Sequence, residues 1–214
     1  MTALRYTLLA DGSSDRCLIW IINWLLDSIP EVATRGFIPQ TADLRRLPEP
    51  PKEFADRIVQ AIRQFPCDIL FVHRDAEAQP REKRTEEIRD AVNKVVTLPH
   101  VSIVPVRMTE AWLLLEEDAI RKAADNPNGV IRLDLPSIAN LERIPDPKKV
   151  LSELLVMAAE KSGRRKEQFE RDIPVRRQRV AELIRDFAPL RQLAAFQALE
   201  SDLKAAVKRC AAGN

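Results

Sequence analysis

The chain has 214 residues, of which 45% are hydrophobic, which is enough for one well-buried core with a helical addition. Lys and Arg number 34 and Asp and Glu number 32, so the overall charge predicts no partner. The three cysteines are widely separated and share no metal-ligand spacing with the two histidines. This excludes a zinc site of Cys and His ligands and favours a reducing, cytoplasmic compartment. The apolar run at residues 17–26 is too short to span a bilayer, so no membrane segment is expected.

The first predicted elements are a strand, a tight turn and a helix. Residues 4–10 are β-prone and end at residues 11–14, which combine turn chemistry with residues that cap helices. A helix is predicted over residues 15–28, and Pro30 ends it. Because this helix is apolar on nearly every face, it is expected to pack on a sheet and also against another helix or a second subunit, which leaves a homodimer open.

The next elements continue the alternation of strands and helices. A β-like piece at residues 36–40 leads through a proline-rich connection into a helix at 54–65, whose apolar residues recur at helical spacing. Residues 68–73 form the continuous apolar run expected of a buried parallel strand. A helix at residues 85–96 and a strand at 101–106 follow. The pattern so far predicts strands that pair in parallel.

A helix at residues 111–124 completes the series, and the alternating order favours an α/β fold with a mostly parallel sheet and helices on both faces. Residues 126–146 are rich in Pro, Asn and Asp, with residues 130–133 as an optional short strand. We therefore expect an α/β core at residues 1–125, an irregular linker at 126–146 and a helical extension at 147–214 that packs on the core. The helices expected in the extension are residues 147–161, 175–186 and 189–209.

Five acidic side chains follow the predicted strands: Asp11, Asp15, Asp75, Glu77 and Glu110. Ligands of parallel α/β sheets bind beyond the carboxyl ends of the strands. Taken singly, each acid also suits a capping, loop or helix-dipole role. Taken together, carboxylates from neighbouring strand ends would repel one another without a cation, and hard oxygen ligands point to Mg²⁺ or Mn²⁺ with a phosphodiester substrate. His73 has no visible partner in the sequence and is left out of this predicted site.

Three short motifs resemble those of a known family. Residues 11–15 (DGSSD) resemble the Glu-Gly-x-x-Asp/Glu turn of the Toprim superfamily, and residues 75–77 (DAE) resemble its Asp-x-Asp motif. Residues 110–116 (EAWLLLE) are similar to the Glu-Ala-Trp-Leu-Leu-x-Asp segment of small stand-alone Toprim proteins. Those proteins are related to the nuclease domains of the OLD (overcoming lysogenization defect) family. The resemblance covers residues 4–120 and is moderately specific.

The resemblance implies a Toprim-like (Rossmann-like) fold and a divalent-metal-dependent nuclease. The residues implied are Asp11 and Asp15 as metal ligands or general base, Asp75 and Glu77 as metal ligands, and Glu110 as a further ligand or positioning acid. Two positions depart from the family pattern, since Asp11 stands where Glu is usual and Glu77 where Asp is usual. We expect the two exchanges to compensate for each other, and the alternative is a weakened or lost activity. Glu116 also falls on a family acid, although a surface helix position explains it equally well.

The resemblance further implies that the partners are nucleic acid, with DNA expected, and an ATPase of a phage-defence or mobile-element system. The chain has no Walker-type GxxxxGK[ST] motif, so such an ATPase would be a separate subunit. One alternative is a non-catalytic Toprim-like subunit that binds nucleic acid or the ATPase. A weaker alternative is a doubly wound domain of the response-regulator kind, which usually has a Lys on the last strand where this chain offers Arg107.

The segment from Lys161 to Arg179 carries eight basic and three acidic side chains. Such a local excess neutralises nucleic-acid phosphates and supplies salt-dependent affinity. The residues predicted to bind nucleic acid are Arg164, Arg165, Arg176, Arg177 and Arg179. The alternative is an exposed helical face in which arginines pair with glutamates.

Overall fold

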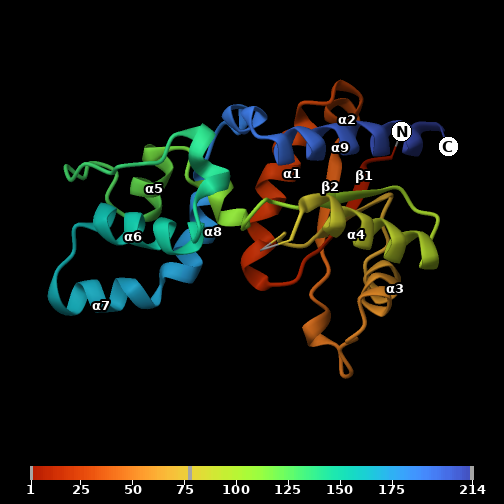
Figure 1. Ribbon diagram of the computed structural model, residues 1–214, viewed down its shortest axis with the longest axis horizontal. Helices are drawn as coiled ribbons and strands as arrows, with labels where there is room; N and C mark the ends of the chain where they lie inside the picture. Colours follow the sequence, from red (N-terminus) through yellow and green to blue (C-terminus); the bar gives the residue numbers. More distant parts are fainter. Residues whose placement is uncertain (1, 77–78, 213–214) are drawn as a thin grey trace. The chain divides into compact units, whose positions relative to one another are not determined.

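The computed structural model describes residues 2–76 and 79–212, and within them four parallel strands form one sheet in the order β2-β1-β3-β4 (Figure 1). The strands are β1 (Leu4–Leu9), β2 (Phe37–Thr41), β3 (Ile69–His73) and β4 (His100–Ile103). From β1 the chain proceeds outward to β2, and from β3 it proceeds outward to β4 on the other side. The point between β1 and β3 is therefore the topological switch point, where open α/β sheets bind their ligands.

Helices pack on both faces of this sheet, which confirms the predicted α/β, Rossmann-like class. The helical elements around the sheet are η1 (Ser13–Cys17), α1 (Leu18–Asp27), α2 (Pro30–Arg35), η2 (Leu44–Arg46), α3 (Phe54–Gln64), α4 (Arg81–Val95) and α9 (Ala194–Ala212). The Tyr6 hydroxyl of β1 donates a hydrogen bond of 2.6 Å to Asn23 of α1. Ile58 of α3 and Ile88 of α4 are buried with Leu70 of β3 in one apolar cluster. The alternate residues of the strands thus serve two separate cores.

Contacts divide the chain into two compact units, a first unit of Met1–Val106 with Ala195–Asn214 and a second unit of Arg107–Ala194. Helix α9 belongs to the first unit, where the Phe196 ring lies 6.5 Å from the Trp24 ring and the Cys210 thiol lies 3.3 Å from the Asp68 carbonyl oxygen. This division differs from the one expected from the sequence, which drew the boundary at residue 125 and kept the C-terminal helices together.

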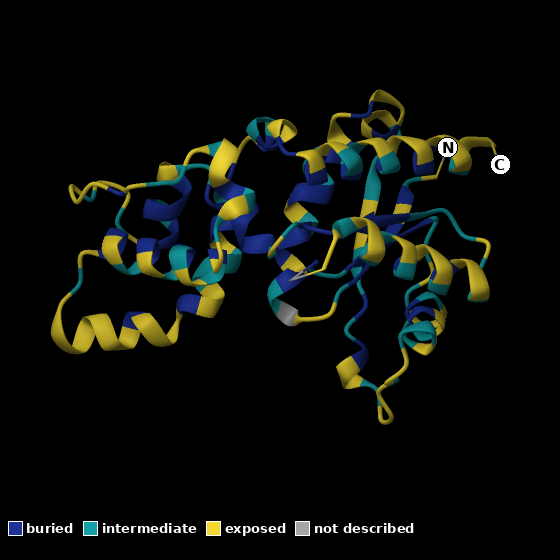
Figure 2. Ribbon diagram, in the orientation of Figure 1, coloured by how far each residue is buried: buried dark blue, intermediate teal, exposed yellow. Residues whose placement is uncertain are grey.

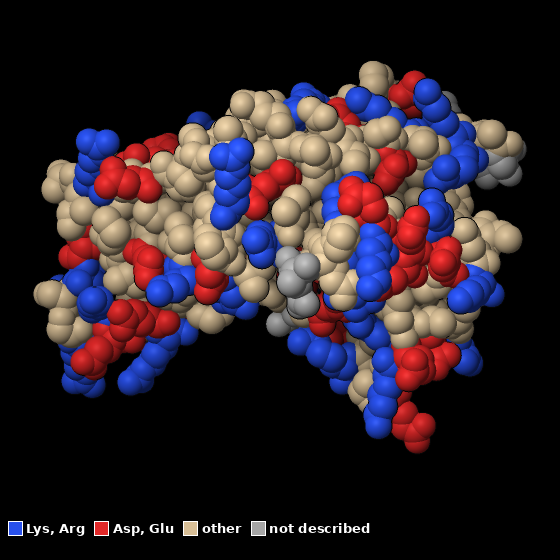
Figure 3. Space-filling view, viewed as in Figure 1, with Lys and Arg blue, Asp and Glu red and all other residues tan. Residues whose placement is uncertain are grey.

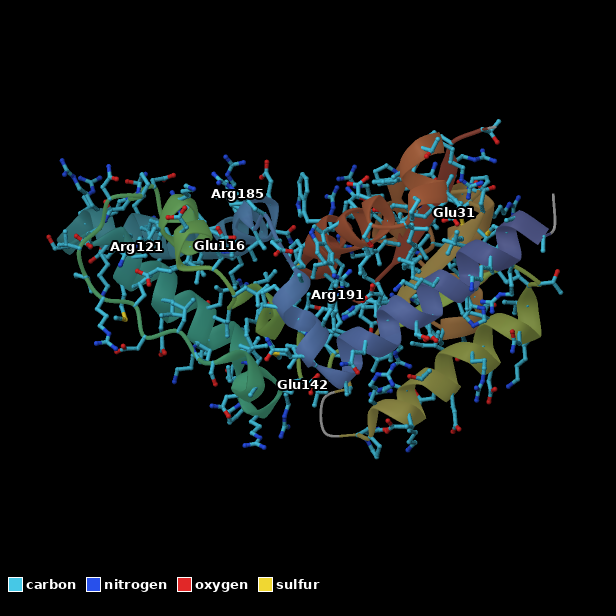
Figure 4. All side chains as sticks on the ribbon, turned by 90° about the horizontal axis from the view of Figure 1, so that it is seen from above. Glu31, Glu116, Arg121, Glu142, Arg185 and Arg191 are labelled. Atoms are coloured by element: carbon cyan, nitrogen blue, oxygen red, sulfur yellow. The ribbon has the colours of Figure 1, made fainter. Side chains whose placement is uncertain are left out.

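The second unit is mainly helical. Its elements are η3 (Thr109–Leu113), α5 (Glu117–Ala123), η4 (Ile138–Arg143), α6 (Pro147–Ala159), α7 (Gly163–Arg171), α8 (Ile173–Leu183) and η5 (Ala188–Gln192). Helices α5, α6 and α8 pack against one another. Arg121, labelled in Figure 4, is buried and donates from Nη2 to the Glu117 carboxylate and to the Ile131 carbonyl oxygen, both at 2.6 Å. These bonds fix the irregular chain after α5.

Several predicted elements differ from the observed ones. The helix expected at residues 111–124 is the 3₁₀ helix η3 followed by α5, and residues 130–133 form no strand. Helix α2 begins at Pro30, the residue expected to end a helix. Helix α7 was not expected, and Figure 2 shows it exposed along almost its whole length. Within the described residues, no helix is both long enough and apolar enough to cross a membrane.

Candidate functional site

The turn after β1 holds Asp15 in a buried position. Asp15 lies on η1 and accepts a hydrogen bond of 2.9 Å at Oδ2 from the backbone N–H of Gly12. A Cβ atom at residue 12 would lie 3.2 Å from that same oxygen, so glycine permits the close approach. The Ser14 hydroxyl donates to the other oxygen at 3.2 Å. Both oxygens of Asp15 are therefore engaged within its own turn.

His73, the last residue of β3, joins two of the predicted acids. Its Nδ1 lies 3.5 Å from Asp15 Oδ2 and its Nε2 lies 3.2 Å from Asp75 Oδ1, and its side chain is only 1% exposed. Burial alone would lower the pKa of His73, but hydrogen bonds and charges of Asp15 and Asp75 raise it to about 9. The ring is therefore an imidazolium at neutral pH. His73 was not among the predicted site residues, yet it links the ends of the two strands.

The charge of His73 acts on its neighbour in return. Burial would raise the pKa of Asp15, but the hydrogen bond and charge of His73, helped by the Gly12 N–H, lower it below the ordinary value. Asp15 is thus ionised and buried. A carboxylate held in this way positions the His73 ring and is a poor acceptor for a substrate proton, because its oxygens already accept hydrogen bonds.

Asp11 is the most accessible of the described strand-end acids, with a side chain 43% exposed. Its Oδ1 lies 2.8 Å from Nη1 of Arg57 on α3, and its Oδ2 lies 3.5 Å from Nε of Arg74 after β3. Arg57 also donates to the Ala10 carbonyl oxygen at 2.9 Å. Arg74 in turn reaches Glu87 of α4 at 3.2 Å, so Asp11 belongs to a mixed network of charges.

The cationic side chains at the strand ends change the expectation that crowded acids need a metal ion, because they supply positive charge without one. His73, Arg57 and Arg74 already neutralise the three acids Asp11, Asp15 and Asp75. Among the described residues, no group of three or more His, Cys, Asp or Glu side chains is arranged to hold a metal ion. Glu77, the fourth predicted acid, lies outside the described residues.

The donor chemistry still suits a hard divalent cation. Asp11 and Asp75 offer carboxylate oxygens at adjacent strand ends and remain 43% and 27% exposed. Mg²⁺ commonly binds through one or two carboxylates and completes its coordination with water and substrate phosphate, without a full protein cage. Asp11 and Asp75 therefore fit the role of the accessible ligands, while Asp15 is committed to His73.

The remaining predicted acids lie in the second unit. Glu110 is buried in η3, and its Oε1 lies 3.6 Å from Nη1 of Arg177 on α8. Glu116 accepts a hydrogen bond of 3.3 Å from the backbone N–H of Arg185, and Figure 4 shows these two residues side by side. Both acids therefore have partners inside their own unit, which accounts for their positions without a ligand.

The predicted nucleic-acid-binding arginines fall into two groups. Arg164 and Arg165 lie on the exposed helix α7, where Figure 3 shows basic side chains mixed with acidic ones. Arg176 lies 2.7 Å from Asp125 and stacks over the Phe169 ring, so it belongs to the packing of the second unit, as Arg177 does. The last of the set, Arg179, pairs with Glu182 at 2.6 Å along α8. Arg164 and Arg165 are thus the more available for a partner.

The strand ends at the switch point of the parallel sheet carry the two accessible acids Asp11 and Asp75, the buried Asp15 with His73, and the two arginines Arg57 and Arg74. Comparison with known proteins adds no assignment, since no family model, curated protein or solved structure matches the chain.

Proposed function

We propose that the protein is a divalent-metal-dependent nuclease of the Toprim kind, acting at the carboxyl ends of β1 and β3. The observation that carries the proposal is that Asp11 and Asp75 follow the neighbouring strands β1 and β3 at the switch point of the sheet, where His73 joins Asp75 to the buried Asp15. The motifs DGSSD, DAE and EAWLLLE supply the family resemblance. The expected substrate is DNA.

In this proposal Asp11 and Asp75 hold Mg²⁺ or Mn²⁺, with Glu77 as the further acid that the DAE motif implies. The bound ion would supply an activated water and stabilise charge on the phosphodiester. Asp15 acts through His73 as a positioning residue, because the buried ring fixes one oxygen of Asp75. Asp11, partly exposed, is the more accessible to substrate of the two acids on the first turn.

Arg57 and Arg74 would bind the phosphate of the substrate. Each contacts Asp11 through an N–H group, and a guanidinium also binds phosphate oxygens in the same planar geometry. When a phosphate and a cation arrive together, the arginines can transfer their contacts from the carboxylate to the phosphate. The Asp11 oxygens then become available to the cation.

The exposed basic helix α7 supports contact with the nucleic-acid backbone, and we propose a separate ATPase subunit as partner in the cytoplasm. The motif-level resemblance is the basis for the ATPase, because the chain itself carries no Walker-type motif.

A non-catalytic subunit that binds nucleic acid or an ATPase is the second candidate. One observation favours it, namely that each described acid at the strand ends already has a cationic partner. Such a network of charges is stable without a metal ion, and a purely structural or binding role is enough to explain it.

Incubation with supercoiled DNA, linear DNA and RNA under Mg²⁺, Mn²⁺ and EDTA separates the two candidates. We expect cleavage with Mn²⁺ at least as strong as with Mg²⁺, because Mn²⁺ tolerates altered ligand geometry better, and none in EDTA. Asp11→Asn should abolish cleavage, whereas Asp90→Asn, which removes an exposed acid of α4, should retain it. Absence of cleavage under every condition, combined with DNA binding, would favour the non-catalytic subunit.

A further inference from the structure

A small cavity opens beside Asp11, on the β2 side of the switch point. Its volume is about 220 Å³, and Leu9 and Thr41, the last residues of β1 and β2, lie in its lining. The cavity belongs entirely to the first unit and is called here the β1–β2 pocket. It adjoins the proposed catalytic acid without containing Asp15, His73 or Asp75.

The lining of the β1–β2 pocket is rich in charge. It includes four cationic side chains and two carboxylates, namely Arg16, Arg45, Lys52, Arg57, Asp11 and Asp43. Two of the cations are already paired, Arg57 with Asp11 at 2.8 Å and Arg45 with Asp43 at 2.9 Å. Among the described residues, Arg16 and Lys52 have no ion-pair partner, and both are exposed. The pocket therefore carries an excess of two positive charges that its own residues leave uncompensated.

An anion with two negative charges matches this excess. A phosphate monoester carries about −1.5 to −2 charges at neutral pH, whereas an internal phosphodiester carries one. The volume is below the range of roughly 300–1,000 Å³ typical of sites that enclose a whole small molecule. The remaining wall is apolar, formed by Leu44, Pro50 and Pro51, and suits the non-ionic face of a sugar or base. Size and charge together favour a terminal phosphate with its adjoining nucleoside.

We propose that the β1–β2 pocket is a phosphate-monoester subsite that receives the terminal phosphate of a nucleic-acid strand. The assignment of that monoester to a strand end rests on the proposed nuclease function. Arg16 and Lys52 bind the phosphate directly, and Arg45 can swing from Asp43 onto it. The terminal nucleotide would then lie against Asp11, so phosphorylated strand ends are the preferred substrate class.

The test separates binding from cleavage. Binding of inorganic phosphate, a nucleoside 5′-monophosphate, the 3′-monophosphate and the unphosphorylated nucleoside is measured by calorimetry in EDTA. The double variant Arg45→Ala/Lys52→Ala changes two exposed pocket residues, and Arg63→Ala/Lys94→Ala is its matched control, since Arg63 and Lys94 are also exposed and lie outside the pocket lining. The monophosphates should bind and the nucleoside should not. The double variant should bind at least about tenfold more weakly, while Arg63→Ala/Lys94→Ala should match the wild type.

Cleavage of oligonucleotides with 5′-phosphate, 3′-phosphate or hydroxyl ends then identifies which end is used. Preference for one phosphorylated end, lost in the double variant, supports the subsite. Equal binding of nucleoside and monophosphate, or equal monophosphate affinity in wild type and double variant, would overturn it. Monophosphate binding without cleavage of any substrate would leave the subsite standing and reject the proposed nuclease. Equal cleavage of oligonucleotides with phosphate and with hydroxyl ends, together with no binding of monophosphates, would reject the subsite but not the proposed nuclease.

Discussion

His73 lies between two carboxylates, with Asp15 at one ring nitrogen and Asp75 at the other. Viewed from the sequence, the acids should repel one another, and removing one should stabilise the protein without metal. The imidazolium reverses that expectation, because each acid now stabilises a buried positive charge. Whether a substitution at Asp75 raises or lowers the stability of the protein therefore depends on His73, which was not among the predicted site residues.

Asp75→Asn should destabilise the metal-free protein. The substitution removes the negative charge that faces His73 Nε2 at 3.2 Å, and we expect a loss of roughly 1–3 kcal/mol in the free energy of unfolding, measured by urea titration in EDTA. Asp90→Asn on the exposed face of α4 is the control and should change little. A free energy of unfolding above that of the wild type would instead show that the acids repel one another in the metal-free protein.

Stability should also fall between neutral and alkaline pH. Because the folded protein raises the pKa of His73 from 6.5 to about 9, this residue contributes fully below pH 6.5, and its contribution of about 3 kcal/mol is lost as pH rises through 9. The difference in unfolding free energy between wild type and His73→Gln should therefore shrink over that interval. His100→Gln is the matched control, since burial lowers the pKa of His100 and its contribution changes only below pH 6.5. A difference that stays constant from pH 6 to 9 would exclude a protonated His73.

Some of the residues at the strand ends could be predicted from the sequence, and others could not. The positions of Asp11, Asp15 and Asp75 at one edge of the sheet could be predicted, because acids directly after parallel strands gather there. Arg57 could not, since it reaches Asp11 across 46 residues of chain from the side of a helix. The contact of His73 with Asp15 depends on the pairing of β1 with β3, which no local pattern specifies, whereas Asp75 is only two residues from His73 in the sequence.

Two helices, α2 and α7, show where local patterns mislead. Proline is favoured in the first turn of a helix because its missing N–H has no intrahelical partner there, so Pro30 begins α2 as readily as it could end α1. Helix α7 buries only Phe169, and a helix with one buried residue lacks the apolar stripe that reveals helices in a sequence. The strongly periodic α3 and the apolar β3 were both predicted correctly.

Charge reversal on α7 tests its proposed contact with nucleic acid. Arg164→Glu/Arg165→Glu should weaken DNA binding and reduce the slope of log K against log salt by roughly two units, since each lost phosphate contact lowers it by about one. Arg132→Glu/Lys149→Glu changes two exposed cations elsewhere in the second unit and should leave the slope unchanged. Salt titrations that coincide for all three proteins would reduce α7 to a solvated helix.

At the scale of the whole molecule, the chain divides into two compact units at boundaries that the sequence did not predict. The alternation of strands and helices predicted the parallel sheet, because that order leaves few other topologies. The whole extension of residues 147–214 was expected to pack on the core, and the alternation did not predict that only its last helix belongs to the first unit, since an amphipathic helix can pack on any apolar surface. Helix α9 buries Phe196 near the Trp24 ring, together with Leu199 and Leu203, so tertiary contacts place it in the first unit.

Phe196→Ala should therefore destabilise the first unit. Phe196 is fully buried, and truncating a buried phenylalanine costs about 3–5 kcal/mol, which chemical unfolding followed by circular dichroism would measure. Lys208→Ala, on the exposed side of α9, is the control and should remain within about 0.5 kcal/mol of the wild type. Equal stability of Phe196→Ala and wild type would show that α9 does not contribute to this core.

The central claim is that Asp11 and Asp75 together hold a divalent cation. Thermal unfolding of wild type, Asp11→Asn and Asp90→Asn in EDTA and in increasing Mn²⁺ tests it without knowledge of the substrate. A bound ion stabilises the folded state by RT ln(1 + [L]/Kd), about 2.7 kcal/mol at a hundredfold excess over Kd. Wild type and Asp90→Asn should therefore melt at progressively higher temperature as Mn²⁺ rises, while Asp11→Asn should respond much less. Identical responses of all three proteins would contradict a metal site at these strand ends.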